Sequence, residues 1–82
     1  MKEVLKFSAN WCGPCQMLSK TIKEIPDIAI PIKEIDIDEE LDLAAKYNIR
    51  SVPTLVMLEN GSEVKRVSGA LQSSKLKEFL NG

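Results

Sequence analysis

The sequence contains no histidine. Imidazole is therefore excluded as a general base, a proton shuttle or a metal ligand. Charge of one sign is also scarce, because 11 basic and 12 acidic residues leave a net charge of -1. The longest run of like charge is the acidic triplet at 38–40. This balance argues against nucleic acid or an anionic membrane as a partner.

Long hydrophobic runs are lacking as well. The longest strongly apolar stretches are short segments such as 55–58, whereas a membrane-spanning helix needs about 20 apolar residues. The opening residues MKEVLK do not lead into the apolar segment of a secretory signal, so we expect a cytoplasmic protein without a membrane segment. With 82 residues, 44% of them hydrophobic, the chain is expected to form a single domain, 1–82, with a modest core.

Cysteine occurs at one place only. Both thiols, Cys12 and Cys15, lie in the stretch NWCGPCQ at 10–16. Apolar residues recur at helical spacing from Pro14 onward, so a helix is expected to begin at the cysteines. Residues three apart on a helix have side-chain roots about 5–6 Å apart, which a disulfide tolerates. Amide N–H groups and the helix dipole favour a thiolate at Cys12, which we expect to be exposed.

The residues between the cysteines suit this interpretation, but alternatives remain. Pro14 fits the first helical turn, and Gly13 leaves the sulfur approachable. A structural disulfide across so short a gap adds little stability, because it removes little chain entropy. A closed zinc site needs four ligands, so metal or cluster binding would require two copies of the chain. Reversible dithiol chemistry is favoured over bridged metal binding or inert thiols.

Apolar periodicity and turn residues predict an alternating α/β chain. The expected elements are a strand at 3–9, a helix at 14–25, a strand at 30–37, a helix at 41–48, strands at 52–58 and 63–67, and a helix from 72–74 to 80. The order β-α-β-α-β-β-α predicts a four-stranded mixed sheet flanked by three helices. Pro31 lacks an amide donor, so the second strand is expected at an edge and the first near the centre.

Short motifs along nearly the whole chain carry a family resemblance. They are Phe7, WCGPC at 11–15, ID at 37–38, IRSVPT at 49–54, NG at 60–61, GAL at 69–71 and KEFL at 77–80. Together they resemble the thioredoxin family and imply a thioredoxin-like fold. The family's usual N-terminal strand and helix are lacking, which brings the length close to that of a glutaredoxin. Their loss is expected to uncover part of one face of the sheet.

The resemblance implies a thiol–disulfide oxidoreductase that reduces protein disulfides. Cys12 is then the attacking thiolate and Cys15 the resolving thiol, and their disulfide is the redox group, with no other cofactor and no metal. Electrons are expected from a thioredoxin reductase or from glutathione, and the protein is expected to be a monomer. The alternatives are a glutathione-dependent, glutaredoxin-like reductase and a non-catalytic protein-binding module.

The resemblance also implies a surface for targets around the cysteines. Val52 precedes Pro53 in a segment similar to the family's cis-proline loop, and its backbone is expected to pair with an extended target. The other residues expected to contact targets form an apolar rim around the sulfur: Trp11, Gly13, Pro14, Gly69 and Ala70.

Two charges beneath the cysteines differ from the family. Six residues before Cys12, where the family has a buried aspartate, this chain has Lys6; where the neighbouring strand often has a lysine, it has Glu34. We expect these two residues to form a swapped ion pair below the disulfide. Lys6 would favour the thiolate, and a partly buried Glu34 would take the proton from the resolving cysteine. The alternative is two solvated charges on an uncovered face.

Overall fold

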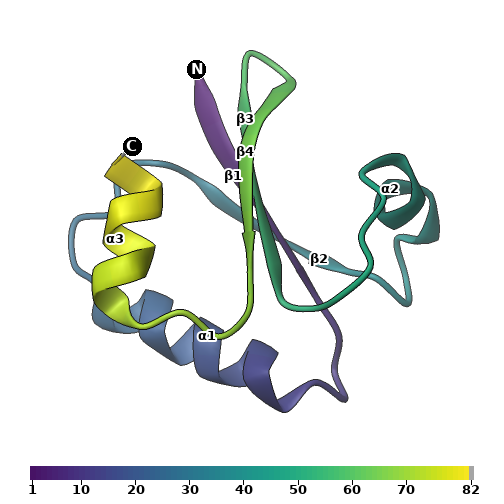
Figure 1. The fold of residues 1–82 in the computed structure, drawn as a ribbon, viewed down its shortest axis with the longest axis horizontal. Coiled ribbons are helices and arrows are strands. Elements are labelled where there is room, and N and C mark those ends of the chain that lie inside the picture. Colours follow the sequence, from purple (N-terminus) through teal and green to yellow (C-terminus); the bar gives the residue numbers. More distant parts are fainter. Residues whose placement is uncertain (82) are drawn as a thin grey trace.

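A computed structural model describes residues 1–81 and confirms the predicted order of elements (Figure 1). The elements are β1 (Lys2–Ser8), α1 (Gly13–Glu24), β2 (Ile32–Asp36), α2 (Leu41–Lys46), β3 (Thr54–Glu59), β4 (Ser62–Ser68) and α3 (Ser73–Asn81). None of the helices in this described part is long and apolar enough to cross a membrane.

The four strands form one mixed sheet in the order β2-β1-β3-β4. β1 pairs in parallel with β2 and antiparallel with β3, and β3 pairs antiparallel with β4. The predictions that the second strand lies at an edge and the first inside the sheet are confirmed. Pro31 was expected within the edge strand but precedes it, and its carbonyl oxygen accepts a 2.9 Å hydrogen bond from the Val4 amide.

The sheet places its two sets of side chains in separate cores. One core lies on the face covered by α1 and α3, and its buried residues are Val4, Leu18, Leu55, Met57, Leu76 and Leu80. The other lies on the face next to α2, and its buried residues are Leu5, Phe7, Ile35, Val56 and Leu58. Because side chains alternate along a strand, Lys6 and Ser8 lie on the same face of the sheet as Val4, the face that α1 covers.

Several boundaries differ from the predicted ones by a few residues, for local reasons. α2 ends at Lys46, because Tyr47 caps it and Asn48 has a φ of +53° in the left-handed region. The third strand begins at Thr54, because Pro53 has no N–H for the ladder. Pro26 follows the end of α1 closely, as predicted, with Ile25 as the C-cap.

The turn between β3 and β4 is the predicted tight hairpin. Asn60 and Gly61 both have positive φ angles, +53° and +86°, as two-residue hairpin turns of this type require. The ladder is irregular at one point: Met57 pairs with Lys65 whereas Leu58 pairs with Glu63. Val64 is therefore the extra residue of a β-bulge on the edge strand, and it is exposed.

Candidate active site

The two cysteines form a disulfide at the start of α1. Their Cα atoms are 5.3 Å apart, and Cys12 is the N-cap residue of the helix. Its Sγ accepts a hydrogen bond from the backbone N–H of Cys15, at 3.1 Å. Pro14 lies in the first turn, where its missing N–H leaves no hydrogen bond unmade. The prediction that an amide at the helix start points at the Cys12 sulfur is therefore confirmed.

Cys12 itself is buried, and the expectation that it is exposed is wrong for the disulfide form described here. The residue is 4% exposed and Cys15 is 2% exposed. They pack with Ala9 and with the half-buried Ile37 and Val52, which close around the sulfur. The neighbouring Gly13 and Pro14 are exposed, so the first turn of the helix faces solvent although the disulfide next to it is largely covered.

The expected rim residues converge on the disulfide from three loops. The carbonyl oxygen of Val52 lies 3.7 Å from Cys12 Sγ, and the Val52–Pro53 peptide bond is cis, as the resemblance implied. The amide of Gly69 donates to the carbonyl oxygen of Pro53 at 2.9 Å, which fixes the loop after β4 beside this segment. Gly69 has a φ of +103°, which favours glycine. Ala70 is exposed next to it.

Trp11 is 70% exposed, the largest exposed aromatic surface beside the disulfide. Its indole Nε1 donates to Asp38 Oδ2 at 3.0 Å, and the Asp38 amide in turn donates to Asp36 Oδ1 at 2.8 Å. The indole is thereby fixed to the loop after β2. Sequence reasoning missed Asp38, because a carboxylate between a strand and a helix is explained equally well by helix capping.

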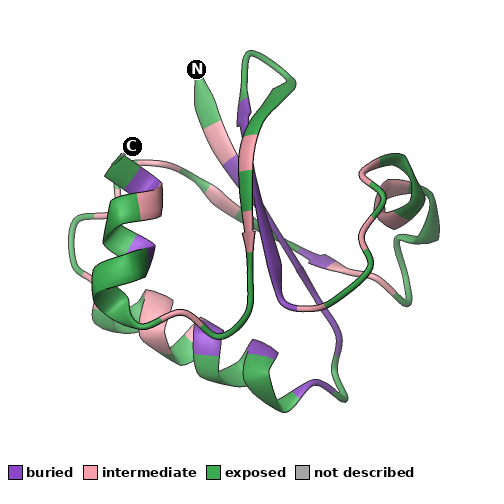
Figure 2. Ribbon diagram, in the orientation of Figure 1, coloured by how far each residue is buried: buried purple, intermediate pink, exposed green. Residues whose placement is uncertain are grey.

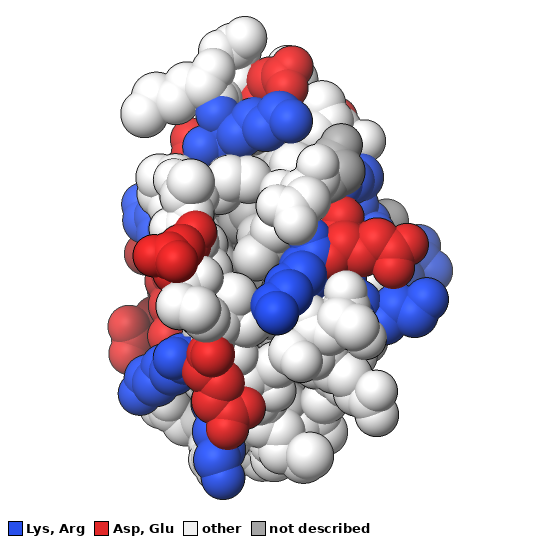
Figure 3. All heavy atoms as spheres, turned by 90° about the vertical axis from the view of Figure 1, so that its left-hand side faces the viewer, with Lys and Arg blue, Asp and Glu red and all other residues white. Residues whose placement is uncertain are grey.

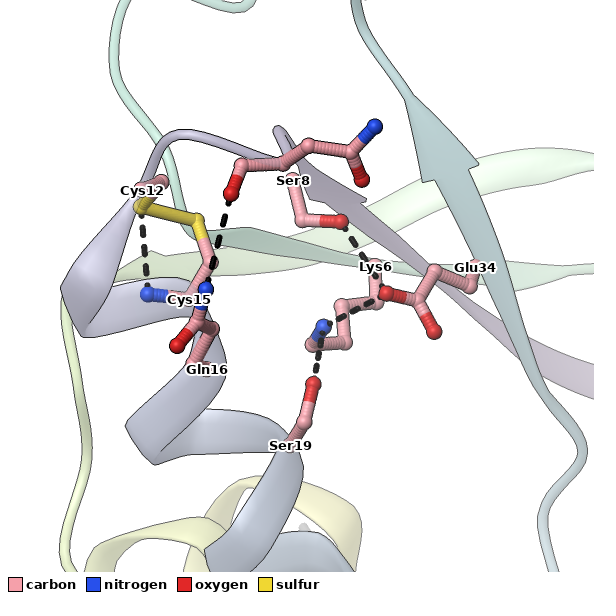
Figure 4. A network of polar contacts seen from close by, with 8 residues as sticks. Lys6, Ser8, Cys12, Cys15, Gln16, Ser19 and Glu34 are labelled. Atoms are coloured by element: carbon pink, nitrogen blue, oxygen red, sulfur yellow. Dashed lines mark hydrogen bonds and ion pairs between the residues drawn. A yellow bond between two sulfur atoms is a disulfide. The ribbon is translucent and has the colours of Figure 1, made fainter.

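The expected ion pair between Lys6 and Glu34 is present. These residues are register partners on β1 and β2, and Lys6 Nζ lies 3.1 Å from Glu34 Oε1. The Lys6 side chain is only 3% exposed whereas that of Glu34 is 66% exposed, so the partial burial expected of Glu34 is not found. Figure 4 shows Lys6 reaching toward α1 below the disulfide.

Two serines complete this network. Ser19 Oγ accepts a 2.6 Å hydrogen bond from Lys6 Nζ, and Ser8 Oγ donates to Glu34 Oε1 at 3.2 Å (Figure 4). Sequence reasoning missed both serines. Ser19 had a usable signal, because it follows Cys15 by four residues and therefore lies on the same face of the helix.

A hollow connects this network to Cys15. It has a volume of about 110 Å³, and its lining residues are Lys6, Ser8, Ala9, Asn10, Cys15, Gln16, Ser19 and Glu34. Cys12 is not part of the lining. The charges beneath the disulfide therefore face Cys15 more directly than Cys12.

Two hollows elsewhere in the described structure are lined by no cysteine. One of about 200 Å³ between the end of α1 and α3 is lined mainly by apolar residues of the segment 25–30. An open one of about 310 Å³ beside β4 and α3 is lined by the charged Lys65, Arg66, Lys75 and Glu78 together with apolar residues. Among residues 1–81, no group of three or more histidine, cysteine, aspartate or glutamate side chains is placed to hold a metal ion. On the face with α3, basic and acidic side chains are intermingled (Figure 3).

Comparisons with known proteins agree with this site. The thioredoxin family model matches residues 1–82. A thioredoxin of Pyropia yezoensis is 40% identical over 81 residues, covering 95% of this chain and 76% of the relative. One of Mycoplasma genitalium is 36% identical over 80 residues, covering 95% of this chain and 78% of the relative.

Solved structures give the same result. Thioredoxin of Fasciola hepatica matches with a TM-score of 0.85 at 37% identity, over 98% of this chain and 78% of that one. Thioredoxin of Malassezia sympodialis matches with a TM-score of 0.85 at 33% identity, over 98% and 72%. This chain thus spans about three quarters of the length of the proteins it matches.

These matches and the cysteine geometry favour a thioredoxin over the glutaredoxin-like and non-catalytic alternatives. Thioredoxins act on protein disulfides and use no cofactor beyond the redox-active disulfide, which here joins Cys12 to Cys15 at a helix start. The chain belongs to the thioredoxin family and is a thiol–disulfide oxidoreductase.

Proposed function

We propose that this protein reduces disulfide bonds in other proteins, with Cys12 as the attacking cysteine and Cys15 as the resolving one. The observation that carries the assignment is the hydrogen bond from the Cys15 amide to Cys12 Sγ. A helix start that donates to this sulfur stabilises a thiolate there once the disulfide is reduced. Cys15 lies within α1 and is not its N-cap residue.

The reaction proceeds in two exchanges. The Cys12 thiolate attacks one sulfur of the target disulfide, forms a mixed disulfide and releases the other target sulfur as a thiolate that takes a proton. The Cys15 thiolate then attacks Cys12 Sγ, which breaks the mixed disulfide and forms the Cys12–Cys15 bond. The target gains two electrons and the cysteine pair loses two.

Target binding is assigned to the surface around the disulfide. The carbonyl oxygen of Val52 lies 3.7 Å from Cys12 Sγ, so an extended target that pairs with this backbone brings its own disulfide next to the attacking sulfur. The residues proposed to contact the target are those expected from the sequence: Trp11, Gly13, Pro14, Val52, Pro53, Gly69 and Ala70. Trp11 supplies the largest exposed apolar area among them.

The electron donor is proposed to be a thioredoxin reductase rather than glutathione. The named relatives are thioredoxins, and proteins of this family are typically reduced by such an enzyme. We further propose that the protein acts as a monomer in a reducing cytoplasm, where the dithiol is regenerated. Reduction by purified reductase without glutathione, compared with glutathione alone, tests the choice of donor.

The proton-acceptor role expected for Glu34 stays a prediction. Its carboxylate lies 3.1 Å from Lys6 Nζ, but the side chain is 66% exposed, so the partial burial expected for this role is not found. Replacing Glu34 with Gln tests the role directly: a proton acceptor at this position requires slower turnover at neutral pH with almost unchanged alkylation of Cys12.

The test of the proposed function is trapping with a Cys15→Ser variant. Without the resolving thiol, the mixed disulfide between Cys12 and a protein target is expected to accumulate, and turnover is expected to fall at least 1,000-fold, on the scale seen when a nucleophile is lost. Cys12→Ser is the matched control and captures nothing. Failure of Cys15→Ser to form a mixed disulfide with any disulfide-bonded protein contradicts the proposal.

A further inference from the structure

A buried cation adjoins the resolving cysteine. The Lys6 side chain is 3% exposed, and its Nζ is bound by Ser19 Oγ at 2.6 Å and by Glu34 Oε1 at 3.1 Å. An ammonium group carries three donors, so one N–H remains beyond these two partners. The ammonium lines the same hollow of about 110 Å³ as Cys15. A charge removed from water at this position acts on whatever shares the hollow.

The ion pair does not cancel this charge, because its two members differ in solvation. The carboxylate of Glu34 is on a side chain that is 66% exposed, so water screens its field. The ammonium of Lys6 is out of water, where the effective dielectric constant is lower and an electrostatic interaction is stronger. The net field in the hollow is therefore positive.

The other groups around the pair do not reverse this sign. Lys23 of α1 lines an adjoining hollow with Lys6, Ser19 and Glu34, and it adds a second positive charge on the solvent side. On β3 the register partner of Lys6 is the uncharged Leu55. α3 contributes no residue to either hollow. Glu34 on β2 is thus the single carboxylate among the lining residues of the two hollows.

We propose that Lys6 is a positioning residue for the second exchange, in which its ammonium stabilises the thiolate of Cys15 through the shared hollow. This inference rests on the proposed function, because it concerns the step in which Cys15 releases the target. A nearby cation favours a thiolate over a thiol by direct electrostatic attraction. The chain thereby activates its resolving cysteine with a buried cation and needs no buried carboxylate.

In the step, the proton of the Cys15 thiol leaves through the hollow to water. The remaining thiolate attacks Cys12 Sγ of the mixed disulfide, and the bond between Cys12 and the target sulfur breaks. The target leaves as a thiolate and takes a proton from water, while the Cys12–Cys15 disulfide forms. Lys6 transfers no proton and no electron; it lowers the cost of the negative charge on Cys15.

The energetics of the buried cation fit such a role. A buried ion pair often contributes no more to stability than well-packed apolar side chains of the same size. The position of Lys6 on an inner strand, opposite Leu55, is one that an apolar residue would fill without this cost. A functional benefit therefore explains a lysine there better than a contribution to stability does.

The experiment measures target release at a target concentration high enough that capture by Cys12 is not limiting. Release is measured in a single turnover as the disappearance of the mixed disulfide between Cys12 and a labelled target, in samples quenched by alkylation at successive times. Lys6→Met keeps an unbranched side chain up to the ε position and removes the charged group; we expect release to slow about tenfold and its pH profile to move up by about one unit. Glu34→Gln removes the opposing charge, and release is expected to be faster.

Two controls separate charge from structure and from the proposed function. Ser19→Ala removes a hydrogen bond from the same ammonium but keeps its charge, so release should stay within about threefold of the unsubstituted protein. Capture is measured separately in Cys15→Ser and in Cys15→Ser combined with Lys6→Met. If Cys15→Ser captures no target, the proposed function fails. If both variants capture the target normally, the release measurement alone decides the role of Lys6.

The outcomes divide clearly. Slower release with the shifted pH profile in Lys6→Met, and faster release in Glu34→Gln, supports the proposal. Release within twofold of the unsubstituted protein in Lys6→Met overturns it, and so does a tenfold slowing in Glu34→Gln, which would make Glu34 the proton acceptor instead. If Lys6→Met does not fold, the direction of the change in Glu34→Gln decides between the two roles.

Discussion

The two faces of the sheet are covered to different extents. α1 and α3 lie on one face and each buries two residues, whereas α2, on the other face, has no buried residue (Figure 2). The sheet residues beneath α2 are nevertheless buried: Phe7 and Val56 are 0% exposed and Leu58 is 5% exposed. The half-buried side chains that cover them are Ile37, Leu43, Tyr47, Ile49 and Val52.

This difference shows how a short chain keeps its catalytic chemistry in a well-covered environment. The disulfide lies at the start of α1, Ser19 lies on α1, and Lys6 lies on the sheet face that α1 covers. Helices exclude water on this side of the sheet. On the other face, Lys33 and Arg66, the register partners of Leu5 and Val56, are exposed on the two edge strands. Both faces have a buried core, but only the face of α1 and α3 is covered by helices with buried residues of their own.

Truncating one leucine on each face of β3 gives the largest expected effect. Leu55, 1% exposed, packs under α1 and α3, and Leu58, 5% exposed, lies on the face of α2. Leu55→Ala should lower the free energy of unfolding by about 4 kcal/mol and Leu58→Ala by about 2–3 kcal/mol, because the less constrained face relaxes around the cavity. Denaturant titration measures both. Equal losses would show that the two faces are packed alike.

Removing the connection between α2 and the sheet should have a smaller effect. Arg66 Nη2 on β4 donates to the carbonyl oxygen of Tyr47, just after α2, at 2.9 Å. Arg66→Met keeps an aliphatic side chain and should cost about 1 kcal/mol of unfolding free energy. Faster amide hydrogen exchange should be confined to α2, with α1 and α3 unchanged. Uniformly faster exchange in all three helices would contradict a local connection.

The sequence was sufficient for the order of elements and for the cysteine pair, because both depend on local patterns. The β3–β4 hairpin follows from Asn60 and Gly61, whose positive φ angles suit few other residues. The edge position of β2 was predicted correctly from Pro31, but Pro31 lies just outside the strand, so its missing N–H is not what decides that position. The ends of strands and helices were predicted less accurately, because the cap at Tyr47 and the missing N–H of Pro53 shift them by a few residues.

The surroundings of the cysteines were harder to predict, because they depend on contacts between distant segments. The pair of Lys6 and Glu34 was inferred from strand register, but nothing local indicates that only the lysine is buried. The contact between Trp11 and Asp38 joins residues 27 apart in sequence. The burial of Cys12 depends on Val52, which is 40 residues away along the chain.

The smallest predicted effect concerns the pH dependence of the α2 face. Arg66 donates two hydrogen bonds to Glu63, which lower the pKa of that carboxyl below its ordinary value of 4.5. A lowered pKa in the folded state means that the contribution is complete above pH 4.5 and is lost as the pH falls through the folded-state pKa. Because the pair is solvated, Glu63→Gln should lower the unfolding free energy at pH 7 by only a fraction of a kcal/mol. The difference between the two proteins should shrink below pH 4.5 and in 1 M salt, and a difference that grows on acidification would give the shift the opposite sign.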